Sequence, residues 1–165
     1  MIEIGLMGPE DLDQVTAIEQ ASFAQEPWSR EAFEKELSNP CARYVLLRED
    51  GRVLAFAGAW LVLDEAQITN IAVLPGQRGK GYGERVTRAL LQLCADSGMA
   101  YATLECRRSN IAAQNLYHKV GFVDVGYRKR FYQGVEDALI MLNQHLPEGN
   151  PDNDPFLQRE PEEPC

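Results

Sequence analysis

The segment from Asn70 to Gly83 constrains the fold more than any other part of the chain. It contains an apolar run, a Pro-Gly break and then alternating glycines, Asn-Ile-Ala-Val-Leu-Pro-Gly-Gln-Arg-Gly-Lys-Gly-Tyr-Gly. Because Glu84 begins a stretch with apolar residues at helical spacing, this pattern predicts a strand, a tight turn and a helix. Glycines at the start of a helix leave backbone N–H groups open to phosphate oxygens. The alternative is that they only form a tight connection.

The spacing of these glycines distinguishes between kinds of phosphate loop. No Gly-Lys-Ser/Thr closes the segment, and the last glycine is misplaced for a dinucleotide fingerprint. After a strand that ends Ile-Ala-Val-x-Pro, the pattern Arg78-x-x-Gly81-x-Gly83 resembles the pyrophosphate loop of the GCN5-related N-acetyltransferases (GNAT). The resemblance implies the cosubstrate acetyl-CoA and assigns its binding to Ile71, Ala72, Val73, Arg78, Gly79, Lys80, Gly81, Tyr82, Gly83, Glu84 and Asn110.

This loop departs slightly from the family's pattern. Gly79 and Glu84 stand where a second arginine is expected, which leaves Arg78 and Lys80 as the cationic partners of a diphosphate.

Composition limits the classes of protein that fit. With 165 residues and 45% hydrophobic content, the chain can fill one core, so we expect a single domain over residues 1–146. Residues 147–165 hold six acids, one arginine and five prolines, which predicts a flexible acidic tail. The formal charge of -9 argues against direct nucleic-acid binding and is compatible with a basic peptide partner.

Metal and membrane association are not expected. The four cysteines lie far apart without a C-x-x-C pair, and there are two histidines, so no metal site is predicted. No signal peptide or long apolar run is present, so the expected compartment is the cytoplasm, without membrane contact.

The hydrophobic periodicity predicts the element order β-α-α-β-β-β-α-β-α-β-β. The predicted strands are Ile2–Leu6, Tyr44–Leu47, Val53–Leu63, Ile68–Val73, Ala100–Cys106, Phe122–Tyr127 and Glu136–Leu142. The predicted helices are 8–21, Arg30–Leu37, Glu84–Ser97 and Ile111–Val120. Asp50-Gly51 predicts a hairpin turn. This is the GNAT order, and the resemblance implies an α/β (α+β) fold, with a central mixed, bent sheet and helices on both faces.

Several stretches are similar to a narrower group, the bacterial RimI family. They are Pro27-Trp28-Ser29, Leu63-Asp64-Glu65-Ala66, Leu104 to Asn110, Asn115-Leu116-Tyr117, Gly121-Phe122 and Glu136-Asp137-Ala138. That family acetylates the N-terminal alanine of a small-subunit ribosomal protein, number eighteen of the set. The stretches are shared in part with the catalytic subunits of archaeal and eukaryotic N-terminal acetyltransferases, so the resemblance defines the reaction more narrowly than the substrate.

Direct attack of an amine on a thioester needs a base, a stabilised oxyanion and a proton for the thiolate. By resemblance, Glu105 is the general base and Tyr117 the general acid. A phenol with a pKa of about 10 can protonate a thiolate whose conjugate acid has a pKa near 8.5. The structural alternatives are an ion pair of Glu105 with Arg107 or Arg108, and a packed Tyr117 ring. Asn110 equally fits a helix N-cap.

The resemblance also assigns the remaining parts of the site. The backbone of Ile71 to Val73 pairs with the pantetheine amides, and an N–H near Val73 meets the oxyanion. Trp28, Phe131 and Tyr132 line the peptide side. The family often has a Tyr-Tyr pair here, so Phe131 lacks one hydroxyl, and Arg128 to Arg130 are expected in a solvated basic loop.

Two other functions remain open from the sequence. The chain could acetylate lysine side chains or small amines, against which the features at Trp28 and Tyr132 argue mildly. It could also be a non-catalytic module that binds acyl-CoA or a partner, in which case Glu105 and Tyr117 would be dispensable.

Overall fold

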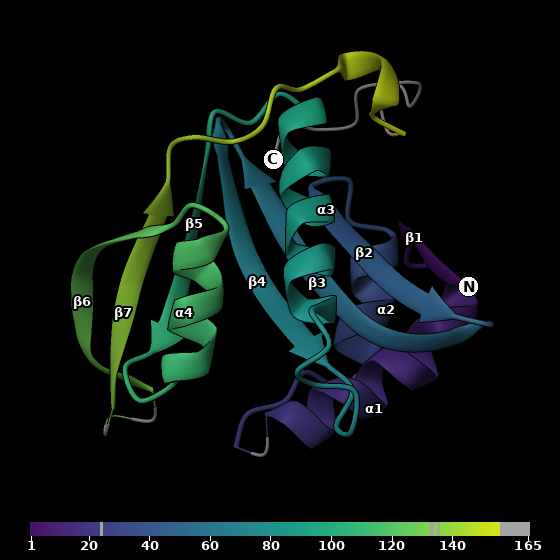
Figure 1. Ribbon diagram of the computed structural model, residues 1–165, viewed down its shortest axis with the longest axis horizontal. Helices are drawn as coiled ribbons and strands as arrows, with labels where there is room; N and C mark the ends of the chain where they lie inside the picture. The colour runs from purple at the N-terminus through teal and green to yellow at the C-terminus, as the bar shows by residue number, and fades with distance from the viewer. Residues whose placement is uncertain (24, 133, 135, 156–165) are drawn as a thin grey trace.

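A seven-stranded mixed sheet organises the molecule, with strand order β1-β2-β3-β4-β5-β7-β6 (Figure 1). The computed structural model describes residues 1–23, 25–132, 134 and 136–155. The strands are β1 (Ile2–Leu6), β2 (Ala42–Glu49), β3 (Arg52–Val62), β4 (Glu65–Val73), β5 (Tyr101–Arg107), β6 (Val123–Tyr132) and β7 (Glu136–Asn143). The α-helices are α1 (Leu12–Ser22), α2 (Arg30–Leu37), α3 (Tyr82–Asp96) and α4 (Ile111–Lys119), and 3-10 turns span Pro9–Asp11 (η1) and Pro151–Asn153 (η2).

The helices cover both faces of the sheet. Helix α3 packs against β2 to β5 in the larger core, which also takes in α4, whereas α1 and α2 pack on the opposite face against β2 and β3 (Figure 1). Val86 and Leu90 of α3 are fully buried in the first core, and Val15 and Phe33 are fully buried in the second. Strands β7 and β6 extend the sheet beyond β5. The predicted bent, mixed sheet with helices on both faces is thereby confirmed.

A β-bulge at Thr69 changes the direction of β4. Asn70 pairs with Gly58 and Ile68 pairs with Ala59, so Thr69 is an extra residue without a partner in β3. Such an insertion bends a strand and reverses which face its later side chains occupy. Ile68 accordingly packs against the α3 core, whereas Ala72 is buried in the α1–α2 core.

Strands β4 and β5 pair over a short stretch only. Their parallel register covers three pairs, from Glu65 opposite Tyr101 to Gln67 opposite Thr103. Beyond these pairs the two strands diverge, and Figure 1 shows them as the arms of a V that opens away from the first residues of β5. We call this unpaired part, Ile68–Val73 of β4 and Leu104–Arg107 of β5, the β4–β5 opening.

The predicted elements match the structure closely, with corrections at their ends. Asp50 and Gly51 both adopt positive φ, 50° and 82°, as a tight hairpin turn requires. Helix α3 begins two residues earlier than predicted, at Tyr82. Strand β6 runs on to Tyr132, so the expectation that residues 128–130 form a loop was wrong: they lie within the strand. Pairing of β6 with β7 supplies backbone partners that the local sequence pattern does not reveal.

Residues 147–155 belong to the predicted tail and lie along α3. Gln92 donates to the carbonyl of Glu148 at 2.9 Å, and the backbone N–H of Asn150 donates to Asp96 at 2.8 Å. Asp154 lies 4.0 Å from the buried guanidinium of Arg43. The domain boundary at residue 146 and the flexibility of the tail stay predictions, and residues 156–165 lie outside the described part.

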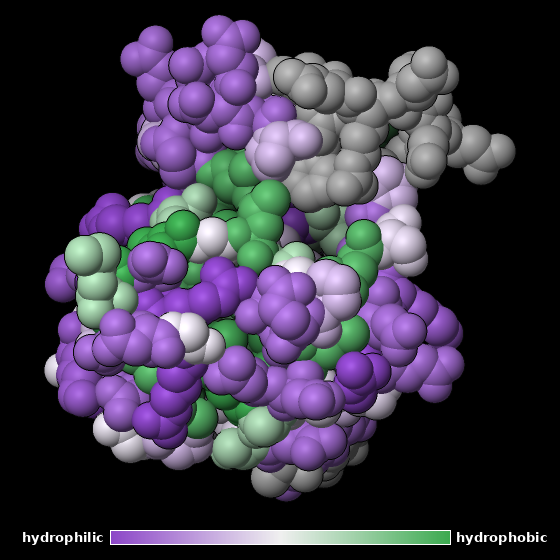
Figure 2. Space-filling model, turned by 90° about the vertical axis from the view of Figure 1, so that its right-hand side faces the viewer, coloured by the Kyte–Doolittle hydropathy of each residue, from purple (hydrophilic) through white to green (hydrophobic). Residues whose placement is uncertain are grey.

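The described surface is predominantly polar on the side that Figure 2 presents, with apolar residues scattered among hydrophilic ones. Among the described residues, no helix combines the length and the apolar character needed to cross a lipid bilayer.

We expect Gly58→Ala to lower the free energy of unfolding by about 1–3 kcal/mol, because a Cβ at this position would overlap the Tyr44 ring. Tyr44 sits beside the bulge and interacts through its hydroxyl with Thr69 at 3.1 Å. Urea unfolding measures the loss. Gly126→Ala is the matched control, because a Cβ in that strand would find its nearest neighbour at 4.0 Å. Equal stability of the two variants would contradict the close approach.

Candidate active site

The glycine-rich loop between β4 and α3 has a backbone that only glycine adopts easily. Gly76, Gly79 and Gly81 have φ of 89°, 79° and 82°, and an L side chain at such angles is strained. A Cβ on any of these three would meet no atom within 4 Å, so the space beside the loop is open. The loop therefore presents bare backbone to whatever lies beside it.

The start of α3 adds hydrogen-bond donors and positive charge to this loop. Among the described residues, none accepts a hydrogen bond from the backbone N–H groups of Gly79 to Glu84, as is usual for the first turn of a helix. Arg78 and Lys80 are exposed next to them; their nearest polar contacts are Ser22 at 3.4 Å and Gln77 at 2.9 Å. Free N–H groups, the positive end of the helix dipole and two cations together suit a diphosphate.

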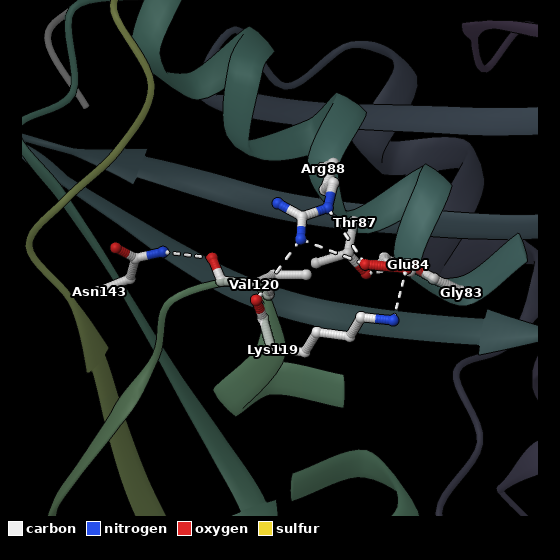
Figure 3. A network of polar contacts seen from close by, with 7 residues as sticks. All are labelled: Gly83, Glu84, Thr87, Arg88, Lys119, Val120 and Asn143. Atoms are coloured by element: carbon white, nitrogen blue, oxygen red, sulfur yellow. Dashed lines mark hydrogen bonds and ion pairs between the residues drawn. The ribbon is translucent and has the colours of Figure 1, made fainter. Parts of the chain in front are cut away.

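The side chain of Glu84 points away from this role, toward α4 (Figure 3). Its carboxylate lies 3.2 Å from both Lys119 and Arg88, and hydrogen bonds from Lys119 and then Arg88 hold its pKa below the usual range. Arg88 also reaches the carbonyl of Lys119, at 3.5 Å. These contacts, the α3–α4 clamp, join the two helices, so among the groups of Glu84 the backbone N–H remains open to a ligand.

The β4–β5 opening leaves backbone groups of β4 without a strand partner. On one edge β4 pairs with β3 as far as Val73, whereas on the other edge no described strand pairs with it beyond Gln67. The side chains of Ile71 and Val73 pack against the α3 core. An extended ligand that carries amides can pair with this edge as an added strand would.

Glu105 lies on the face of β5 opposite α3 and α4. Ala102, Leu104 and Cys106 are buried in the α3 core, and alternation along the strand directs Glu105 to the other side. Its carboxylate forms an ion pair with Arg128 of β6, whose Nε lies 2.9 Å from Oε1 of Glu105.

The alternative for Glu105, an ion pair with Arg107 or Arg108, was wrong because Glu105 pairs with Arg128 instead. Arg107 pairs with Glu136 at 3.1 Å, and Arg108 pairs with Asp137 at 3.4 Å. Both contacts bind the start of β7 to the turn before α4.

Tyr117 comes from α4 and packs on the side of β5 that Cys106 occupies. Its ring lies 6.1 Å from Phe122, so the expected aromatic contact exists. Burial raises the pKa of its phenol above the usual value near 10. Among the described residues none hydrogen-bonds to this hydroxyl. The phenol therefore keeps its proton at neutral pH and has it available for another acceptor.

Asn110 begins α4 as the sequence predicts for an N-cap. Its side chain accepts from the backbone N–H of Ala113 at 3.1 Å. This bond fixes the first turn of the helix that carries Tyr117.

The two candidate catalytic groups thus lie on opposite faces of the sheet, beside the same opening. A thioester that entered from the α3–α4 face would present its sulfur on the side of Tyr117. An amine that approached from the other face would arrive on the side of Glu105.

The three predicted peptide-side aromatics lie on two sides of the opening. Trp28 packs with Phe33 and Trp60, at ring distances of 5.5 and 5.9 Å, on the α1–α2 face. Phe131 and Tyr132 form their own pair, 5.2 Å apart, at the end of β6. Burial, followed by the nearby Cys106 and Glu105, raises the pKa of Tyr132 to about 12.

A buried polar group that sequence reasoning missed connects Trp28 to β4. Glu19 of α1 is 2% exposed and accepts from the backbone N–H of Trp28 at 3.3 Å and from Asn70 at 3.1 Å. Its second oxygen has no partner among the described residues. A glutamate within an apolar helix face is the only local signal, and Asn70 lies 51 positions away along the chain. The described residues contain no metal-ligating cluster.

We expect Glu19→Gln to abolish the decrease in the free energy of unfolding that ionisation of Glu19 causes as pH rises. Burial raises the pKa of Glu19, so the stabilisation associated with its protonated form is fully present below the unfolded pKa, near 4.3, and is lost as pH rises through the folded pKa. Glutamine keeps the accepting oxygen and does not titrate. The difference in free energy of unfolding, variant minus wild type, should therefore grow between pH 5 and pH 8 in urea titrations. A difference that stays constant with pH would contradict the burial of a charged form.

Comparison with known proteins agrees with this arrangement. The model of the acetyltransferase (GNAT) family matches residues 12–122. A Bacillus subtilis protein is 44% identical over 134 residues, 80% of this chain and 88% of that one, and its name assigns it provisionally as a [ribosomal protein bS18]-alanine N-acetyltransferase. A Salmonella typhimurium protein of that name, without the qualifier, is 38% identical over 146 residues, 86% and 96% of the two chains.

A solved structure is similar throughout. The ribosomal-protein-S18-alanine N-acetyltransferase from Escherichia coli superposes with a TM-score of 0.81 at 34% identity, over 92% of this chain and 98% of that one. The resemblance to the GNAT superfamily and to its RimI members is confirmed, and with it the assignment as an enzyme. The chain belongs to the GNAT family and is an acetyltransferase.

Proposed function

We propose that the protein transfers the acetyl group of acetyl-CoA to the α-amine of an N-terminal alanine, with ribosomal protein bS18 as the acceptor. The observation that carries this proposal is the β4–β5 opening with Glu105 on one face and Tyr117 on the other. The names of the relatives from Salmonella and Escherichia coli support the choice of acceptor. The described surroundings are compatible with a peptide because aromatic residues flank the opening.

Acetyl-CoA fits the residues that the chain offers. The diphosphate would lie against the N–H groups from Gly79 to Glu84, with Arg78 and Lys80 as counter-charges. The pantetheine amides would pair with the free edge of Ile71 to Val73, and Asn110 lies at the start of the helix on the same side. Acetyl-CoA supplies an acetyl group already activated as a thioester, so the protein needs no covalent intermediate of its own.

Glu105 would take the proton from the ammonium, directly or through a water, so that a neutral nitrogen attacks the thioester carbon. Attack forms the C–N bond and leaves a negative charge on the carbonyl oxygen, which an N–H near Val73 would stabilise. When that oxygen re-forms the C=O bond, the C–S bond breaks, and the nitrogen releases its second proton to solvent. An N-terminal amine, with a pKa of about 7.7–8.0, has an appreciable neutral fraction at pH 7, unlike lysine at about 10.4, so a modest base suffices.

Tyr117 would return a proton to the thiolate. Its raised pKa makes it a weaker acid than an exposed phenol, yet CoA thiolate is a base that a nearby phenol in a dry site can protonate. The free hydroxyl of Tyr117 supports this role, because a hydroxyl already donating to the protein would have to break that bond first.

Two other activities remain as outcomes of the test. The lysine or small-amine acetyltransferase would accept peptides with a blocked N-terminus or simple amines. A module that only binds acyl-CoA would release no thiol with any amine, and substitution of Glu105 or Tyr117 would change nothing.

Thiol release with a peptide that begins Ala-Arg-Tyr tests the proposed reaction. We expect turnover on the free peptide, no turnover on its N-formyl version, and a fall in kcat of about 10²-fold or more in Glu105→Gln and Tyr117→Phe, because each removes a proton-transfer group. Glu65→Gln is the matched control: Glu65 accepts from Thr103 on the face of β5 that carries Glu105. Turnover that survives blocking of the N-terminus would move the assignment to lysine or small amines.

The KM for acetyl-CoA tests the role of the glycine-rich loop between β4 and α3. We expect Gly81→Ala to raise the KM for acetyl-CoA about 5- to 30-fold, because positive φ costs an alanine about 1–2 kcal/mol and the loop relaxes away from its open geometry. The KM for peptide should change little. Initial rates at varied acetyl-CoA measure the shift, and an unchanged KM would show that the diphosphate binds elsewhere.

A further inference from the structure

Arg128 engages the carboxylate that the proposed function uses as base. Its Nε lies 2.9 Å from Oε1 of Glu105, and its guanidinium lies over the Phe131 ring at 5.4 Å from the centroid. The two side chains differ in exposure, with 57% of Arg128 and 27% of Glu105 accessible to solvent. The arginine is thus the more exposed partner of the pair, and the carboxylate that it contacts is largely shielded from solvent.

The neighbouring cations have other partners. Arg107 pairs with Glu136 and also lies over the Tyr132 ring at 4.2 Å, and Arg108 pairs with Asp137 and lies over Tyr127 at 4.9 Å. Among the described residues, Arg128 is the one cation in ion-pair distance of Glu105. The ion pair with Glu105 is therefore specific to Arg128, since the neighbouring arginines pair with other carboxylates.

An ammonium that gives its proton directly to Glu105 competes with Arg128 for the carboxylate. The Arg128 guanidinium holds Oε1 at hydrogen-bond distance, whereas a carboxylate offers acceptor sites on both oxygens. The acceptor must therefore either displace the arginine or use the second oxygen beside it. The second route places two positive charges next to each other, so displacement is the route that keeps one cation on the carboxylate.

We propose that Arg128 is a specificity-determining residue whose guanidinium is exchanged for the ammonium of the acceptor when the acceptor binds. This inference rests on the proposed function, because it takes Glu105 as the group that receives the amine. The exchange replaces one cation by another, so the carboxylate remains compensated throughout. A neutral acceptor cannot make this replacement, and the arginine then stays in place.

The surroundings of Arg128 make the exchange inexpensive. Ion pairs between partly exposed side chains contribute little, since water solvates both partners. The released guanidinium can remain on the face of Phe131, where a cation is attracted by the ring. Arg128 also lies where the register between β6 and β7 shifts, between Arg128 and Tyr132, so neighbouring ladder contacts do not fix its backbone on both sides.

The experiment compares Arg128→Gln with Lys129→Gln in the full chain. Both remove one positive charge from β6, and among the described residues Arg128, not Lys129, forms the ion pair with Glu105. We expect Arg128→Gln to lower the KM and the Kd for the Ala-Arg-Tyr peptide about threefold, within the range of an exposed ion pair, with the KM for acetyl-CoA unchanged. Lys129→Gln should leave both constants within error, and Arg128→Lys should restore the wild-type value.

The result that would overturn the inference is an unchanged or raised peptide KM in Arg128→Gln. A fall in kcat without a change in peptide KM would instead show that Arg128 orients Glu105. Peptide Kd, measured with CoA present, gives a second readout: the effect of Arg128→Gln should vanish in the Glu105→Gln background. Far-UV circular dichroism checks that each variant is folded.

The same measurements distinguish a failure of the proposed function from a failure of the inference about Arg128. If the wild type does not turn over the free peptide, or if Glu105→Gln is fully active, the proposed function fails. If wild type and Glu105→Gln behave as expected but Arg128→Gln binds peptide no more tightly, the function stands and the inference alone is wrong.

Discussion

The backbone hydrogen bonds that β4 and β5 do not make are the constraint on which the rest of the structure depends. Two parallel strands at the centre of a sheet would ordinarily pair along their whole length, yet here three residue pairs hold them together. The bulge at Thr69 bends β4, and β5 is held on its other edge by β7 through six pairs from Ala102 to Arg107. The sheet stays continuous although its middle is open, and a ligand with amides can supply the missing partners.

The surrounding elements keep that opening in a fixed geometry. The α3–α4 clamp joins the helix that begins at the glycine loop to the helix that carries Tyr117. On the other face, Glu19 holds the backbone of Trp28 and the side chain of Asn70, so the wall of the α1–α2 face is attached to β4 next to the bulge. An unpaired buried oxygen costs stability. A buried carboxylate of this kind contributes more to position than to the free energy of unfolding.

Local patterns predicted the fold well because they are consequences of local physics. The strand-turn-helix at Asn70 to Gly83, the N-caps at Ser29 and Asn110, and the Asp50-Gly51 hairpin each depend on neighbouring residues. The features that sequence could not predict all join distant segments. Arg128 was expected in a loop because its strand depends on pairing with β7, and its contact with Glu105 depends on two strands that are not consecutive in the sheet. The roles of the site residues stay predictions until tested.

The chain uses the two ends of α3 differently. Its C-terminal end is held by residues 147–155, through Gln92 and Asp96, whereas the glycine loop before its first turn borders open space. A helix anchored by these contacts and by the α3–α4 clamp has little tilting freedom left to lose when an anion docks at its N-terminus. The ordering entropy that binding to a flexible loop would require is then already lost on folding, so preorganisation would add to charge in the affinity for the proposed diphosphate. Shortening the chain before residue 155 would thus weaken binding of that diphosphate at the far end of the helix.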